Sequence, residues 1–302
     1  MSLDWHILPS AIVLKVSGKD ARRYLNSRLS NDLRAAQPGD AVRAAALTAQ
    51  GRVEGLFTVF VQPSDTFYLA CDAGPREEVV AALKRFIVAD RVAVEDLSSQ
   101  ASLVHIAAET SQAAALLQSV GGELLGAAAC ARVSEKGSDC LLLGASHQQL
   151  SDSLRAQLRE PLSSDEYRLR RLKYGLPVFP DEVNGETILT EAGLYEAVSF
   201  TKGCYVGQEV LERSDAIGKL PRALELIRLS GTTAPQPGTA ITSSSGEAFG
   251  KTVSAAVDAA QGATFLFALL RTGKYGVGDK VGCAGMEGEI VQRRLTGRET
   301  GR

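Results

Sequence analysis

The sequence predicts an α+β protein made of two βαβ-like units followed by a small β-barrel. Strand-like and helical patterns alternate over the first hundred residues, and the alternation returns more weakly up to about residue 158. Beyond Pro221 only short strands between Gly- and Ser-rich turns remain, which is typical of a barrel. We therefore place a two-part body at residues 1–220, divided near residue 100, and a barrel at residues 221–302.

The first unit opens with a short strand at residues 12–16 and a helix that carries Tyr24, Leu25 and Leu29 on one face, ending at Asn31-Asp32. Turn sequences around Pro38, Gly51 and Pro63 separate the strands that follow. The later elements expected here are strands at 41–47, 56–61 and 67–71, a helix at about 76–87 and a strand at 91–95.

The second unit and the barrel are predicted from weaker patterns. In the second unit we expect a helix at 114–118, a strand at 140–143 and helices at 148–158 and 166–172. Gly175 and Pro177 end the last helix, and a loop at 180–186 follows. The predicted barrel strands are 224–229, 252–257, 264–270 and 289–293.

Composition excludes several classes of protein. No apolar run reaches the roughly 18 residues that a membrane span needs, and residues 1–9 lack the pattern of a signal peptide, so we expect a cytoplasmic protein. A net charge of −2 argues against a protein whose whole surface binds nucleic acid, although Arg168, Arg170, Arg171 and Lys173 form a local basic cluster. We expect no direct binding of nucleic acid. Five cysteines without a CxxC pair and three scattered histidines make a complete zinc or iron–sulfur site within the chain unexpected.

The segment Lys202-Gly203-Cys204-Tyr205-Val206-Gly207-Gln208-Glu209 is the most informative in the chain. Apolar spacing after it predicts a helix that starts near Gly207 and leaves Cys204 in the turn before it. Unpaired backbone N–H groups and the helix dipole favour a thiolate at such a position, and the Lys202 ammonium would add to this effect. A buried cysteine is usually a small hydrophobe, but two glycines and a lysine describe a turn that another group approaches closely. Cys204 is therefore the candidate for chemistry.

This motif and several others resemble the folate-binding, aminomethyltransferase-like proteins of the YgfZ/Iba57 family, which are related to the glycine cleavage T-protein. The segment matches the family signature KGCYxGQE without a departure. Further similarity lies in the run from Ser17 to Leu25, in Ser30-Asn31-Asp32 and in Gly250-Lys251-Thr252-Val253-Ser254, so the resemblance covers nearly the whole chain.

The resemblance implies three subdomains, two ferredoxin-like units and the barrel, in a ring around a central cavity that holds tetrahydrofolate or a derivative. It also implies a role in maturing or maintaining iron–sulfur enzymes, including those that thiolate tRNA. Cys204 would then be the functional thiol, either a ligand of a transient cluster shared with a partner or an attacking group. The implied partners are folate and iron–sulfur carrier or client proteins, with no membrane.

Residue by residue, the resemblance implies a cofactor site around the same motif. Lys202 and Arg222 would pair with the glutamate tail of the folate, because both offer cationic donors to a carboxylate. Gly203 and Gly207 would permit close backbone approach. The full set of implied cofactor-binding residues is Lys202, Gly203, Tyr205, Gly207, Gln208, Glu209, Arg171, Arg222, Asn31 and Glu54.

Two departures from the related aminomethyltransferases bear on catalysis. Those enzymes have G-x-x-D-D-L where this chain has Gly51-Arg52-Val53-Glu54-Gly55-Leu56, so one carboxylate is missing and the other is longer. They have R-L-E-A-G where this chain has Arg171-Leu172-Lys173-Tyr174-Gly175, so a lysine, which only donates, replaces the glutamate that would accept hydrogen bonds from the pterin. We therefore do not expect glycine-cleavage activity.

Three functions remain open at this stage. The first is the accessory role in iron–sulfur cluster assembly or repair. The second is a tetrahydrofolate-dependent one-carbon transferase, which would need a general base such as Glu54 or Glu209. The third is a binding module in which the motif only joins the body to the barrel, with Tyr205 as a packing anchor and Gln208 and Glu209 as helix-capping residues.

Overall fold

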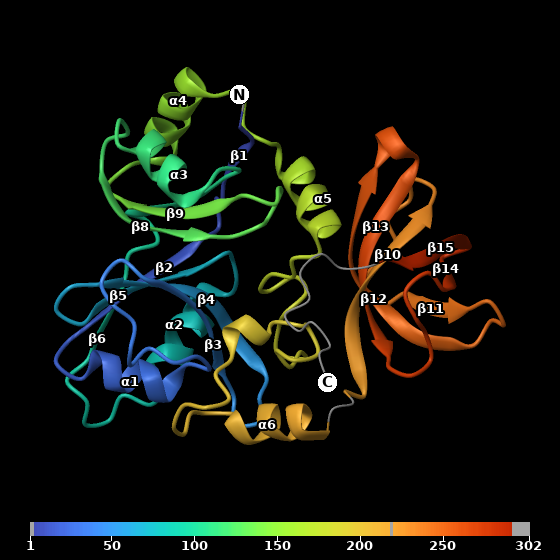
Figure 1. The fold of residues 1–302 in the computed structure, drawn as a ribbon, viewed down its shortest axis with the longest axis horizontal. Helices are drawn as coiled ribbons and strands as arrows, with labels where there is room; N and C mark the ends of the chain where they lie inside the picture. Colours follow the sequence, from blue (N-terminus) through green and yellow to red (C-terminus); the bar gives the residue numbers. More distant parts are fainter. Residues whose placement is uncertain (1–2, 218–219, 292–302) are drawn as a thin grey trace.

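The structure, a computed structural model, describes residues 3–217 and 220–291. It contains two antiparallel sheets and a closed β-barrel arranged side by side (Figure 1). The predicted α+β architecture with a terminal barrel is confirmed. The last two residues of the strand predicted at 289–293, and the end of the barrel domain from residue 292, lie outside the described residues.

The first sheet follows the predicted pattern closely. Its strand order is β3-β4-β5-β2-β6, and every pairing is antiparallel. The strands are β2 (Ile12–Ser17), β3 (Ala41–Leu47), β4 (Val53–Gln62), β5 (Thr66–Cys71) and β6 (Ala93–Asp96). Helices α1 (Ala21–Arg28) and α2 (Arg76–Lys84) bury apolar side chains against it, so one large core forms around Leu25, Phe57 and Val79.

The second sheet has the order β1-β7-β9-β8 and is covered by two helices. Its elements are β1 (Trp5–Ile7), β7 (Ala101–Ile106), α3 (Thr110–Leu117), β8 (Glu123–Ala129), β9 (Ser138–Leu143) and α4 (His147–Gln157). The sequence patterns missed β1, β7 and β8. The three residues of β1 are too few for a periodic signal, and β7 is buried at every position and so shows no alternation of polar and apolar residues. The alanine-rich β8 lacks the alternation of a half-buried strand. Strand β1 pairs with β7, so the start of the chain belongs to the second sheet.

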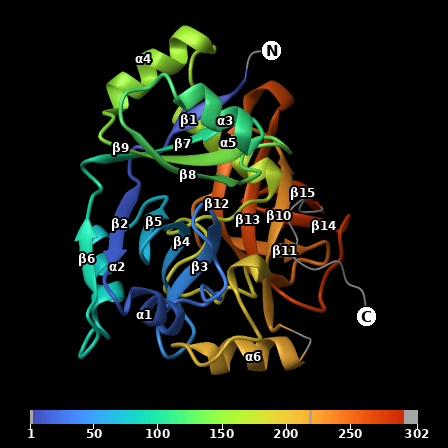
Figure 2. The same cartoon turned by 60° about the vertical axis from the view of Figure 1, so that its left-hand side comes forward.

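A long connection joins the body to the barrel. Helix α5 (Ser164–Tyr174) begins with a capping box formed by Ser163 and Glu166 and ends at Gly175. The following segment passes between the three parts (Figure 1), contains a 3₁₀ turn, η1 (Tyr195–Ala197), and leads into α6 (Gln208–Ile217). Figure 2 shows α6 at the same end of the molecule as α1.

The barrel closes through six antiparallel strands in the order β10-β13-β12-β11-β14-β15. Its strands are β10 (Arg222–Ser230), β11 (Ala240–Ser243), β12 (Ala248–Asp258), β13 (Ala263–Arg271), β14 (Lys280–Cys283) and β15 (Met286–Val291), with a short 3₁₀ turn, η2 (Ala259–Gln261), between β12 and β13. The sequence patterns missed β11 and β14, which have four residues each. Across the described part of the chain, no helix combines the length and apolar character that a membrane span requires.

Candidate functional site

Cys204 lies in an exposed turn directly before α6, as the sequence predicted for this segment. The turn is closed by Gln208, whose side-chain oxygen accepts a hydrogen bond from the Tyr205 backbone N–H at 3.2 Å. Gly207 has a φ of +84°, and a Cβ at this position would lie 2.6 Å from the carbonyl oxygen of Thr48. Only glycine fits both constraints. The shape of the Cys204 turn is therefore fixed by contact with the β3–β4 hairpin.

Lys202 anchors the other side of the turn to the end of α1. Its ammonium donates to the backbone carbonyls of Asn26, Leu29 and Asn31 at 2.5, 2.6 and 2.8 Å. An ammonium has three protons, so all of its donors are used, and the predicted pairing of Lys202 with a folate tail does not fit this geometry. Burial lowers the pKa of Lys202 to about 8.

A hollow of about 360 Å³ borders Cys204. Its polar and aromatic lining side chains come mainly from α1 and from the loop after α2. The lining residues are Tyr24, Ser27, Arg28, Phe86, Asp90, Cys204, Tyr205 and Val206. Arg28 is 1% exposed and places its guanidinium 5.3 Å from the ring centre of Phe86. Sequence analysis missed this cation. The available signal was an arginine four residues after Tyr24, on the buried face of α1.

Glu54 forms ion pairs with Arg28 and Arg85, so it is not free to bind a substrate. One carboxylate oxygen lies 2.7 Å from Arg28 Nη2, and the other lies 2.8 Å from Arg85 Nη1. With both oxygens engaged by guanidinium groups, Glu54 neutralises buried charge and is poorly placed to act as a general base.

The other motif residues serve the turn or the surface. Tyr205 is 7% exposed, and its ring lies 4.6 Å from the Lys202 ammonium. Burial raises the pKa of the Tyr205 hydroxyl to about 12, and this hydroxyl has no hydrogen-bond partner among the described residues. Glu209 is exposed and pairs with Arg213 one turn later on α6. Tyr205 is thus a packing anchor.

A second, deeper cavity of about 640 Å³ lies between the two sheets and the connecting segment. Its wall is mostly apolar and carries a few polar groups. The lining residues are Gly39, Asp40, Ala41, Arg43, Thr58, Ala127, Ala128, Ala129, Cys130, Ala131, Leu176, Pro177, Gly193, Leu194 and Glu196. This composition, apolar walls with a small number of polar groups, is typical of a site for a small organic molecule.

None of the predicted cofactor-binding residues lines this cavity. Asn31 comes nearest, because its side-chain amide donates to the backbone carbonyls of Arg43 and Glu196, both at 2.8 Å. It therefore supports the cavity wall from behind. The sequence missed Arg43, Thr58, Cys130 and Glu196, which no motif connects along the chain.

Arg171, Lys173 and Arg222 hold the parts of the molecule together. Arg171 is 2% exposed and makes a two-pronged ion pair with Glu182, which also accepts a hydrogen bond from Ser254 of β12. The Lys173 ammonium lies 2.9 Å from Asp258 at the end of β12. Two nitrogens of Arg222 each lie 2.9 Å from the Glu191 carboxylate. These cations are paired within the protein, so Arg222 is not a free partner for a folate tail.

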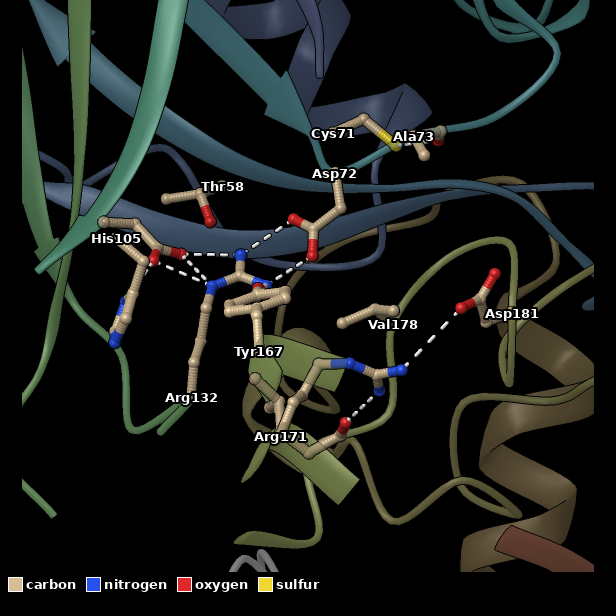
Figure 3. Close-up of polar contacts among 12 residues, drawn as sticks. Thr58, Cys71, Asp72, Ala73, His105, Arg132, Tyr167, Arg171, Val178 and Asp181 are labelled. Atoms are coloured by element: carbon tan, nitrogen blue, oxygen red, sulfur yellow. Dashed lines mark hydrogen bonds and ion pairs between the residues drawn. The ribbon is translucent and has the colours of Figure 1, made fainter. Parts of the chain in front are cut away.

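Arg132 forms a buried ion cluster behind the cavity wall (Figure 3). Its guanidinium bonds to Asp139 of β9, to Asp72 at the end of β5 and to the Tyr167 hydroxyl of α5. Nδ1 of His105 lies 2.9 Å from the same Asp139. Because Arg132 follows Cys130 and Ala131 in the chain, the cluster fixes that part of the wall to both sheets and to α5.

Comparisons with known proteins agree with this architecture. The GCVT N-terminal domain matches residues 11–132. The glycine cleavage system aminomethyltransferase T from Bartonella henselae has a similar fold, with a TM-score of 0.82 and 16% sequence identity over 98% of this chain and 87% of that one. The chain therefore has the fold of the aminomethyltransferase class.

Sequence similarity points to particular relatives within this class of fold. The tRNA-modifying protein YgfZ of Escherichia coli O157:H7 is 27% identical over 239 residues, which are 74% of this chain and 71% of that protein. A chloroplastic protein of Arabidopsis thaliana is 22% identical over 76% of this chain, and the match spans 56% of the plant protein. The chain is thus similar in sequence to tRNA-modifying YgfZ proteins and similar in fold to the glycine cleavage aminomethyltransferase.

Proposed function

We propose that this protein is a folate-binding accessory protein of the cytoplasm that acts in the assembly or repair of iron–sulfur clusters, including those of tRNA-thiolating enzymes. Cys204 is its working thiol. The observation that carries the proposal is the exposure of Cys204, because Cys71, Cys140 and Cys283 are buried and Cys130 is half-buried. A turn held by Gly207 and Lys202 presents this thiol to a partner. The name of the Escherichia coli relative, a tRNA-modifying protein, supports the same direction.

The second cavity, which lies between the two sheets and the connecting segment, suits a reduced folate, a carrier of one-carbon units. We call it the central cavity. Its volume of about 640 Å³ lies in the range of roughly 300–1,000 Å³ that is usual for small-molecule sites. The alanines of β8 with Leu176 and Pro177 offer an apolar surface to a flat ring. Arg43 and Thr58 add hydrogen-bonding groups on the opposite sheet.

A cluster would be cargo shared with another protein. Iron–sulfur clusters are commonly held by four cysteine thiolates, and Cys204 supplies one. The described residues hold no group of three or more histidine, cysteine, aspartate or glutamate side chains placed to bind a metal. The remaining ligands would come from an iron–sulfur carrier or client protein that covers the exposed turn.

The transferase alternative receives less support. It needs a general base beside the folate, and neither Glu54 nor Glu209 lines the cavity. Glu54 is held by two arginines, and Glu209 lies on the outer surface of α6. A one-carbon transfer would have to use other residues.

The test is complementation of cells that lack the protein, with thiolated tRNA as the readout. The native chain, Cys204→Ser and, as a control in the barrel away from the cavity, Cys283→Ser are expressed at equal abundance. We expect rescue by the native chain and by Cys283→Ser, and failure of Cys204→Ser. Equal rescue by all three would contradict the role of Cys204 and make the motif architectural.

A further inference from the structure

The loop between α2 and β6 exposes two large apolar side chains beside the hollow that borders Cys204. Phe86 is 44% exposed and Val88 is 92% exposed. Within residues 3–217 and 220–291, the one other large hydrophobic residue that is exposed to this degree is Val277 of the barrel. Phe86 also lines the Cys204 hollow. Apolar side chains that gather at one place on a protein surface are typical of an interaction site.

This loop is fixed to the elements beneath it. The Ile87 N–H donates to the Lys84 carbonyl at 3.0 Å, and the half-buried Ile87 side chain packs against the core of the first sheet. The Arg91 N–H donates to the Asp20 carboxylate at 2.9 Å, which ties the end of the loop to the start of α1. The residue between Phe86 and Val88 therefore anchors the loop, while these two side chains stay at the surface.

Arg28 supports the Phe86 ring from the protein side. Its buried guanidinium lies 5.3 Å from the centre of the ring. The guanidinium is itself fixed, because it donates to the carbonyls of Ala82 and Leu47, both at 2.8 Å, and to the Glu54 carboxylate. The ring thus has a rigid support before any partner binds. Aromatic side chains that are held in this way make favourable anchors for an interface, because little order has to be imposed on binding.

The ion pairs around these two apolar side chains place their cations outward. The side chain of Arg23 is 71% exposed, whereas that of its partner Asp90 is 18% exposed. The side chain of Arg85 is 51% exposed, whereas that of its partner Glu54 is 15% exposed. Lys84, the last residue of α2, is exposed as well. The outer layer of this surface is therefore positively charged, and its carboxylates lie beneath.

We propose that this surface docks the protein that shares a cluster with Cys204, and that this partner presents an acidic face with an apolar centre. Apolar side chains of the partner cover Phe86 and Val88, and its carboxylates meet the exposed cations, which speeds and orients the encounter. Because Phe86 lines the Cys204 hollow, a partner seated here also covers the thiol. The inference deepens the proposed function and rests on it. The docking surface consists of Arg23, Lys84, Arg85, Phe86 and Val88.

The first test is the rescue of tRNA thiolation in cells that lack the protein. Val88→Glu puts a carboxylate in the apolar centre of the docking surface, and Lys84→Glu reverses one of its charges. The matched controls lie in the barrel: Val277→Glu at an apolar side chain that is 61% exposed, and Lys274→Glu at a lysine whose side chain is 53% exposed. Melting curves and the reactivity of Cys204 with a thiol reagent check that each variant keeps its fold and its thiol. We expect both controls to rescue, and Val88→Glu and Lys84→Glu to fail.

The second test identifies the partner and does not depend on tRNA thiolation. A photoreactive p-benzoylphenylalanine replaces Val88 or, as a control, Val277, and mass spectrometry identifies the segment that is crosslinked in cells. The captured protein is then purified and titrated with the native chain and the variants. We expect a segment rich in acidic and apolar residues, captured from position 88 alone. Val88→Glu should weaken binding by at least about 10-fold, the usual effect of disrupting an interface hot spot, and both controls should bind as the native chain does. Capture of a basic segment, a nucleic acid or a lipid, or equal affinity of all variants, would overturn the inference.

The outcomes separate this inference from the proposed function. If Val88→Glu rescues and Cys204→Ser does not, the docking surface is refuted and the role of the thiol stands. If Cys204→Ser rescues and Val88→Glu does not, the docking surface stands and the role of the thiol is refuted. Rescue by both variants would refute both.

Discussion

The ammonium nitrogen of Lys202 lies 2.6 Å from the carbonyl oxygen of Leu29, and this bond joins the Cys204 turn to the end of α1. Two further bonds, to the carbonyls of Asn26 and Asn31, complete the same contact. These bonds therefore attach the turn to the end of α1, beside the hollow that Cys204 shares with Tyr24 and Arg28.

Removal of the Lys202 ammonium should destabilise the protein. In Lys202→Met three carbonyl oxygens lose a charged donor, which we expect to cost at least about 2 kcal/mol and to lower the melting temperature by several degrees. The control is Lys251→Met, because Lys251 is half exposed and its pair with Glu186 contributes less than about 1 kcal/mol. Thermal unfolding by circular dichroism measures both. Equal melting temperatures for the two variants would show that the Lys202 bonds carry no stability.

The two glycines of the motif should respond differently to substitution. Gly207→Ala puts a methyl group 2.6 Å from the Thr48 carbonyl and forces alanine into the left-handed region, which alone costs about 1–2 kcal/mol. A Cβ at Gly203 meets nothing within 4 Å. We expect a clear loss of denaturant stability for Gly207→Ala and almost none for Gly203→Ala. A similar loss for both variants would disprove the assignment of the constraint to Gly207.

One thiol should react rapidly with a disulfide reagent in the native protein. Cys204 is exposed, whereas Cys71, Cys140 and Cys283 are buried. Burial raises the pKa of the half-buried Cys130 thiol to about 12, so little of its reactive thiolate exists at neutral pH. Stopped-flow absorbance with Ellman's reagent at pH 7.5 should show a fast phase of about one equivalent. This phase should vanish in Cys204→Ser and persist in Cys130→Ser; the reverse pattern would refute the prediction.

The Arg132 cluster should make stability depend on pH in the acid range. Burial by itself would raise the pKa of the Asp139 carboxyl, but the charge of Arg132 and the hydrogen bond from His105 outweigh it and hold the pKa well below its usual value of 3.8. A carboxyl with a lowered pKa in the folded state stabilises the protein above its unfolded-state pKa, and this contribution is lost as the pH falls below about 4.

Asp139→Asn should therefore lower the free energy of unfolding at pH 7 by about 3–5 kcal/mol, the usual effect of removing one member of a buried ion pair. Its stability should then change less than that of the native protein between pH 5 and pH 3. Urea unfolding across this pH range gives both values. The matched control is Asp152→Asn on the exposed side of α4, where the side chain only accepts a hydrogen bond from Gln148. Parallel pH profiles for native protein and Asp139→Asn would contradict the prediction.

Local patterns in the sequence were sufficient for much of the fold. Strand β3 was predicted to the residue, and β2, β5 and α4 to within one residue at each end, because their polar and apolar residues follow the period of the element and their ends carry turn residues or a capping box. Strands β1, β7, β8, β11 and β14 were missed because they are short or lack alternation. These segments become strands because they pair with strands that are distant in the chain; His6 of β1, for example, lies opposite His105 of β7.

The sequence by itself determined the class of fold, the turn before α6 and the thiol at its tip, since each depends on residues that are close together in the chain. Only the tertiary structure decided which polar side chains are free. Four residues that look like ligand-binding residues in sequence are instead paired within the protein. Lys202, Glu54 and Arg222 pair with groups 26 or more residues away, and Arg171 pairs with Glu182 in the following loop. Glu196 carries no motif, and it lies exposed at the cavity wall. The physical reason is that a charge removed from water must find a partner, and long-range packing determines where that partner lies.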